Sequence, residues 1–293
     1  MNKTNITNHT VKSLVLALAF VAAGGAYANV PLNNLQGTGG IAFNPLAYTA
    51  GLPWEGEGTN DLNGVVSKPQ VGTWYTYLDD SGISWTAASV AFSVLDRVEV
   101  SGGYGLIDAY KYGDSSINTY NLGAKLRFLD ENAFDQAWVP ALAVGGVYKY
   151  TDARTVKALG LDNDGFDIYV VASKLITQTP VPVLLSGGVL VSDEVVNGVV
   201  GHNDYDVAGF GNIDVIPVKN VAFGVEYKQG VNAGNGIRNH DYFDAHVAWF
   251  ATPKLTLVGA FVATGDKDRF YRHGSAKDLG VGSGFVLSAQ YQF

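Results

Sequence analysis

From residue 71 to the C-terminus, the sequence repeats short segments in which apolar side chains alternate with small or polar ones. Alternation with a period of two is typical of β-strands, and roughly ten residues is the length that a tilted strand needs to cross a lipid bilayer. The pattern predicts twelve strands. Their ranges are 71–78, 83–94, 97–107, 117–129, 137–150, 165–177, 181–192, 204–216, 219–229, 240–251, 254–264 and 282–293.

The connections between these segments alternate between short and long. The short ones include Leu95-Asp96, 178–180, 217–218 and 252–253, and 130–136 is slightly longer. The long polar ones are 108–116, 151–164, 193–203, 230–239 and 265–281. Bacterial barrels have short periplasmic turns and longer outer loops. We therefore predict an all-β protein, with an antiparallel up-and-down transmembrane β-barrel over residues 71–293.

Each predicted strand has one apolar and one mixed face, as in 219–229, where Phe223 and Val225 oppose Glu226 and Lys228. A charge facing lipid near the midplane costs roughly 2–4 kcal/mol, so the apolar face must point outward. The predicted lumen-lining residues are Arg97, Glu99, Lys125, Arg127, Asp214, Glu226, Lys228, Asp244 and His246. They would either line a water-filled channel or pair across a closed lumen.

The first residues are typical of an export signal. Lys3 and Lys12 precede an apolar run from Leu14 to Ala23, and Ala26-Tyr27-Ala28 supplies the small residues of a cleavage site. A run of roughly ten residues is too short for a membrane-spanning helix, which needs about twenty. We predict a cleaved signal peptide over 1–28, export through the inner membrane, and a mature protein in the outer membrane of a Gram-negative bacterium.

Composition supports this interpretation. Only 16% of residues are charged and there are 36 glycines, whereas an ordinary soluble domain has about a quarter charged residues. There is no cysteine, which excludes disulfides and thiolate ligands, and the net charge of −8 argues against nucleic acid as a partner. We expect no cofactor and no metal, and outer-membrane lipid and lipopolysaccharide as surroundings.

Residues 29–70 do not follow the strand pattern. The stretch from Asn33 to Tyr48 is rich in glycine, and Pro45 and Pro53 disfavour a full strand crossing. Three alternatives stay open: a periplasmic extension, a segment inserted into the lumen as a plug, or two further strands that would make fourteen. We favour the plug or the periplasmic segment.

Two stretches resemble known proteins. The last strand ends at Phe293 and looks like the C-terminal signature that the barrel-assembly machinery recognises in outer-membrane proteins. The stretch Gly39–Tyr48, together with the hairpin Asp96–Ser101, resembles the proteobacterial family called domain of unknown function 3034. That resemblance implies an outer-membrane barrel and brings no substrate or active site.

Asp244 and His246 are the candidates for chemistry, since a carboxylate two residues from a histidine on one strand face can orient it as a general base. Polar neighbours that pair inside a lumen explain them equally, and we predict no enzyme. Asp162–Asp167 lacks the spacing of a calcium loop and fits a turn. The predicted function is passive, porin-like passage of a small solute through a monomer. The alternatives are a closed barrel that acts through its outer loops and a hydrolase active at the rim.

Overall fold

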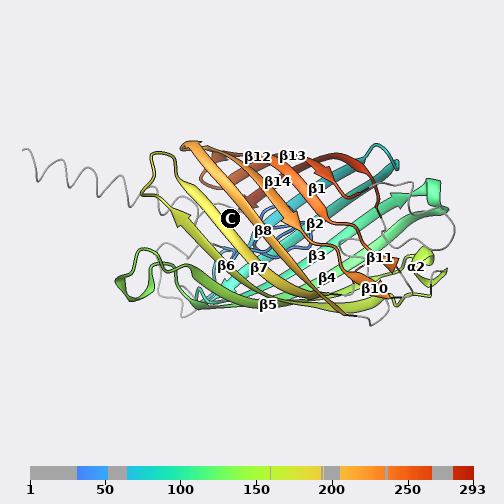
Figure 1. Ribbon diagram of the computed structural model, residues 1–293, viewed down its shortest axis with the longest axis horizontal. Helices are drawn as coiled ribbons and strands as arrows, with labels where there is room; N and C mark the ends of the chain where they lie inside the picture. Colours follow the sequence, from blue (N-terminus) through green and yellow to red (C-terminus); the bar gives the residue numbers. More distant parts are fainter. Residues whose placement is uncertain are drawn as a thin grey trace, which may run out of the picture.

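The computed structural model describes residues 32–51, 65–158, 160–192, 194, 205–234, 237–265 and 280–293. Twelve strands form one closed, all-antiparallel barrel, as predicted (Figure 1). They are β1 (Gln70–Leu78), β2 (Ile83–Val94), β3 (Val98–Ala109), β4 (Asp114–Leu129), β5 (Ala141–Thr151), β6 (Asp164–Ile176), β7 (Val183–Ser192), β8 (Asp206–Val218), β9 (Val221–Lys228), β12 (Tyr242–Thr252), β13 (Leu255–Ala263) and β14 (Ser283–Gln292).

Pairing of the first and last strands closes the barrel. β1 and β14 pair from Gln70↔Gln292 to Leu78↔Gly284, so neither strand keeps a free edge. Every other strand pairs with its neighbours along the chain, with β9 followed by β12. Closure matters because an unpaired backbone edge in lipid leaves N–H and C=O groups without partners.

Several boundaries differ from those predicted. β5 begins at Ala141 rather than 137, directly after Pro140, which has no backbone N–H for the ladder. The preceding turn contains a short 3-10 helix, η2 (Ala133–Asp135). β8 runs through the predicted turn at 217–218, so the turn falls at 219–220.

The connections contain the remaining elements. The β3–β4 connection forms a 3-10 turn, η1 (Tyr110–Tyr112), and the β5–β6 connection contains the short helix α2 (Arg154–Ala158). The connection from β9 to β12 forms a small sheet of β10 (Asn232–Gly234) and β11 (Ile237–Arg238). Within the described residues, neither α2 nor any other helix is long and apolar enough to span a membrane.

The two barrel ends differ in the connections that they carry. The turn end carries the connections between β2 and β3, β4 and β5, β6 and β7, β8 and β9, and β12 and β13; the loop end carries the others. Outward-facing side chains are large and apolar, with Leu122, Ile168 and Leu287 each more than half exposed on the isolated chain. This belt is the surface that lipid would cover.

Residues 32–51 lie inside the barrel, where Figure 1 shows them as the blue segment. Nearly all their side chains are buried, among them Leu32, Ile41, Phe43 and Leu46. The segment folds on itself through backbone bridges between Asn33 and Gly39 and between Gly40 and Pro45. We call residues 32–51 the inner segment. The predicted signal peptide and residues 52–64 lie outside the described residues, and the domain boundaries at 28 and 70 stay predictions.

Candidate functional site: the occupied lumen

A buried ion pair holds the inner segment against β3 and β4. Glu99 and Lys125 are direct cross-strand partners, and strand alternation turns both side chains into the lumen. Glu99 accepts hydrogen bonds from the backbone N–H groups of Gly39 (2.8 Å) and Ala50 (2.7 Å). Lys125 Nζ donates to the carbonyl oxygens of Gly39 and Leu46, both at 3.1 Å. One ion pair therefore binds three separate points of the inner segment.

On the opposite side of the lumen, Glu226 of β9 provides a second anchor. Its Oε2 atom accepts from the backbone N–H groups of Ala42 (3.1 Å) and Phe43 (3.0 Å). Next to it, Asn44 Nδ2 donates to the carbonyl oxygens of Gly211 and Tyr227, both at 3.1 Å. One side-chain oxygen of Glu226 therefore satisfies two neighbouring backbone N–H groups, which makes Glu226 a principal contact between the inner segment and this wall.

Further hydrogen bonds hold the rest of the inner segment, among them two to neutral side chains and one to the Glu131 carboxylate. The Asn33 backbone N–H donates to Gln290 Oε1 (2.6 Å), and that of Ala47 donates to Ser173 Oγ (2.9 Å). The Tyr48 hydroxyl donates to Glu131 Oε2 (2.9 Å) at the turn end. Burial, together with the neighbouring Glu131 carboxylate, raises the pKa of Tyr48 above its usual range, so the phenol stays protonated and keeps donating.

His246 lies between two carboxylates. Its Nδ1 atom is 2.7 Å from Asp244 Oδ1 and its Nε2 atom is 2.8 Å from Asp214 Oδ1, and all three side chains are buried. Glu226 is the cross-strand partner of Asp244, so three carboxylates surround one imidazole. A general base needs a ring nitrogen that can take a proton from a substrate, and here both face protein carboxylates. This geometry does not favour the rim hydrolase.

A second charge cluster connects three strands near the loop end. Lys149 Nζ lies 2.5 Å from Asp167 and 2.6 Å from Glu194, and Lys228 also pairs with Glu194. Glu194 follows β7 and is fully buried. Burial by itself raises the pKa of Glu194, but the Lys149 and Lys228 ammonium groups outweigh it and lower that pKa to about 2.

Seven of the nine predicted lumen residues are buried inside the barrel: Glu99, Lys125, Asp214, Glu226, Lys228, Asp244 and His246. Arg97 and Arg127 lie instead at the turn end. Arg97 pairs with Asp130 (2.6 Å) and Arg127 with Asp96 (2.8 Å), and the Arg97 side chain is 48% exposed. Both arginines form ion pairs with turn residues. Within the described residues, neither has a hydrogen bond or ion pair to the inner segment.

Sequence reasoning missed Lys149, Asp167 and Glu194. The first two fall within predicted strands and share the inward parity of Val147 and Tyr169, so the alternation itself could have identified them. Glu194 had no such signal, since it lies in a predicted loop.

Among the described residues, the remaining histidine shows no arrangement for metal binding. His240 contacts the carbonyl of Asp241, while His202 and His273 lie outside the described residues. Within the described residues, no group of His, Cys, Asp and Glu side chains is arranged to hold a metal ion.

A closed antiparallel barrel with an apolar outer surface and a polar, occupied interior is the architecture of outer-membrane β-barrel proteins. The chain belongs to the family described as protein of unknown function (DUF3034), whose model matches residues 31–273. No curated protein matches it.

Solved outer-membrane proteins have a similar fold. The KdgM porin is 10% identical with a TM-score of 0.50, and the match covers 76% of this chain and 99% of that one. The NanC porin is also 10% identical, with a TM-score of 0.48 and coverages of 76% and 99%. The outer membrane protein Omp33 of Acinetobacter baumannii is 13% identical, with a TM-score of 0.47 and coverages of 78% and 100%. At these identities the likeness concerns the fold alone.

Proposed function

We propose that this protein is an outer-membrane channel for passive passage of a small solute, and that the inner segment is its removable plug. The observation that carries the proposal is how the inner segment is attached. All backbone–backbone hydrogen bonds found for residues 32–51 are internal to the segment, such as Leu35 N to Ala42 O and Leu46 N to Gly39 O. Its hydrogen bonds to the barrel all use a side chain. The plug can therefore move without breaking a β-ladder.

The topology supports an orientation for the channel. Short turns are periplasmic in bacterial barrels, so we assign the turn end to the periplasm and the loop end to the lipopolysaccharide side. Both ends of the barrel sequence, Gln70 and Gln292, are then periplasmic. The C-terminal strand up to Phe293 would present the signal for the barrel-assembly machinery. Nothing in this scheme needs a cofactor or an energy source, because the solute moves down its gradient.

A closed barrel that acts as a scaffold through its outer loops is the second candidate. The observation that favours it is the filling of the lumen: three cavities found beside the inner segment among the described residues measure about 20 Å³, about 20 Å³ and about 50 Å³. Room for one water molecule takes roughly 10–15 Å³, so each of these three cavities holds only a few water molecules while the segment is in place. The two candidates differ in whether the inner segment ever leaves.

Single-channel recording in planar bilayers separates them, with three forms of the mature protein. The first is unaltered, the second has residues 32–51 replaced by a flexible Gly/Ser linker of equal length, and the third is Asn33→Cys with Gly72→Cys. A Cβ at Gly72 would lie 3.5 Å from the Cβ of Asn33, within the range of a disulfide, and the chain has no other cysteine.

We expect steady conductance from the linker form and intermittent openings from the unaltered protein. The oxidised double-cysteine form should be silent and should regain openings when a reductant is added. Each single-cysteine variant is the control, and its openings should be the same before and after the reductant is added. A linker form that folds, as judged by heat-modifiable gel migration, and never conducts would overturn the channel proposal in favour of the scaffold.

A further inference from the structure

The wall of the lumen is divided by charge. Four neighbouring strands, β13, β14, β1 and β2, contain no Asp, Glu, Lys or Arg, whereas all the buried ion pairs described above involve the other strands. Toward the loop end, the inward side chains of this uncharged wall are apolar apart from Thr76, and they include Trp74, Leu78, Trp85, Val262 and Val286. A water-filled channel has a polar interior, so the passage of water does not account for an apolar inner wall.

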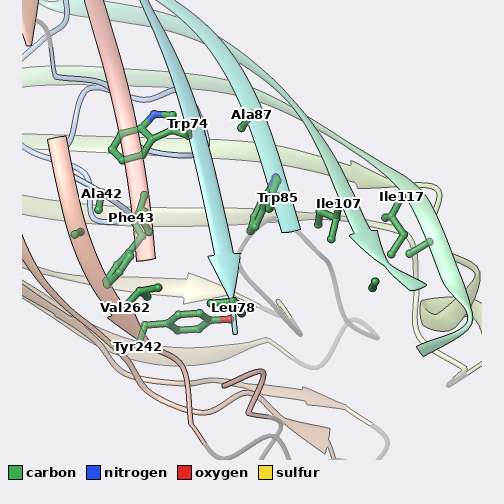
Figure 2. Packing of buried hydrophobic residues seen from close by; sticks show 14 of the residues in the cluster. Ala42, Phe43, Trp74, Leu78, Trp85, Ala87, Ile107, Ile117, Tyr242 and Val262 are labelled. Carbon is green, nitrogen blue, oxygen red and sulfur yellow. The ribbon is translucent and has the colours of Figure 1, made fainter. Parts of the chain in front are cut away.

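The inner segment completes this apolar region. The Glu226 anchor fixes the backbone of Phe43, whose ring packs at 5.9 Å, tilted by 56°, against the ring of Tyr242. Figure 2 shows Phe43 and Ala42 facing Leu78, Trp74, Tyr242 and Val262. We call the cavity between these side chains the apolar chamber. It measures about 50 Å³ and lies between the plug and the loop end of β1, β13 and β14.

The size of the apolar chamber bears on what it can hold. A dry apolar cavity of roughly 150 Å³ binds benzene. The chamber has about a third of that volume, which suits a linear alkyl segment better than a whole ring. The Thr76 hydroxyl borders the chamber without a partner among the described residues, and no charged side chain lines it.

We infer that the apolar chamber binds the alkyl part of a solute before that solute passes the plug. Burial of each methylene contributes roughly 0.8 kcal/mol, so a few carbons would hold a solute weakly and reversibly, as transport requires. That the solute passes the plug after binding rests on the proposed channel function. The binding itself can be measured whether or not the protein is a channel. The solute would contact Phe43, which belongs to the plug.

The test is quenching of tryptophan fluorescence by 6-bromohexan-1-ol in the full-length mature protein in lipid nanodiscs. Trp54, Trp138 and Trp249 are replaced by Phe in all forms, so that Trp74 and Trp85 report alone. Val262→Phe fills the chamber from the wall and Ala42→Phe fills it from the plug. Leu257→Phe adds the same ring to the outward face of β13 and is the matched control.

We expect saturable quenching that weakens by about tenfold or more, equivalent to 1.4 kcal/mol, in both filled variants and is unchanged in the control. Quenching that does not saturate, or that is equal in Val262→Phe and Leu257→Phe, would overturn the inference. The planar-bilayer recordings of the linker form keep the two proposals apart. If the linker form conducts but the full-length protein shows no saturable quenching, the chamber alone is refuted. If the full-length protein shows saturable quenching but the linker form never conducts, the channel alone is refuted.

Discussion

Glu99 Oε2 and Lys125 Nζ lie 2.9 Å apart across β3 and β4, with both side chains completely buried, and together they bind Gly39, Leu46 and Ala50. A buried ion pair by itself often adds little stability, because desolvation offsets the attraction between its charges. Here the remaining polar atoms of both groups are used on the backbone of the inner segment. The position of the inner segment in the lumen therefore depends in part on this ion pair between two titratable residues of the barrel wall.

We predict that Glu99→Gln loosens the plug and raises the fraction of time that the channel is open. Removing one partner leaves the Lys125 charge buried and unpaired, which costs about 3–5 kcal/mol of folding stability. Denaturant unfolding in lipid vesicles, together with channel recording, measures both effects.

The control is Arg97→Gln, which removes an exposed ion pair with Asp130 and should cost only about 0–1 kcal/mol of folding stability. The double variant Glu99→Gln with Lys125→Met should be more stable than Glu99→Gln alone, and a less stable double variant would contradict this account.

A second prediction concerns Glu226, whose Oε2 atom accepts from both Ala42 and Phe43. Glu226→Ala should increase channel opening, since two backbone N–H groups of the plug lose their acceptor. Glu226→Gln keeps one acceptor oxygen at the same position and should stay largely closed. Recording both variants at one pH and voltage checks this. Equal opening in the two would show that charge, rather than the hydrogen bond, holds the plug.

Stability should fall in acid through Glu194. Because Lys149 and Lys228 overcome the effect of burial and lower the pKa of Glu194 to about 2 from its ordinary value of 4.5, its stabilising contribution is fully present above about pH 4.5. That contribution is lost as the pH falls from there toward 2 and Glu194 takes up a proton. Unfolding midpoints measured between pH 7 and pH 2 should decline less steeply for Glu194→Gln. Parallel curves for the two proteins would rule out this role for Glu194.

His246→Gln should act on stability and not on catalysis. The variant leaves the buried carboxylates of Asp214 and Asp244 without the imidazole that both contact, and we expect a loss of about 3–5 kcal/mol. Denaturant unfolding measures the loss, and the added substitutions Asp214→Asn and Asp244→Asn should restore part of it. A hydrolytic activity of the unaltered protein toward ester or peptide substrates that disappears in His246→Gln would contradict this expectation.

The strands, their number and the direction of their faces could be predicted from sequence, because each depends on local chemistry. A side chain at every second position faces lipid, and a lysine or arginine misplaced on that face at the bilayer midplane would cost about 2–4 kcal/mol. The closing pair of β1 and β14 then follows from an even strand count with both ends on one side. Where the prediction failed, as at Pro140, a single residue without an N–H group moved the boundary.

Only the tertiary structure decided where residues 32–51 lie and which buried charges meet. The contact of Ala42 with Glu226 joins residues 184 positions apart, and that of Asn33 with Gln290 joins residues 257 apart. No local pattern encodes such distant partners, since they are selected by the width of the closed barrel and by the need to satisfy every buried polar group. Glu99 shows the difference. Strand alternation alone predicts that its side chain points into the lumen, whereas only the closure of the barrel around the inner segment brings its carboxylate to Gly39 and Ala50.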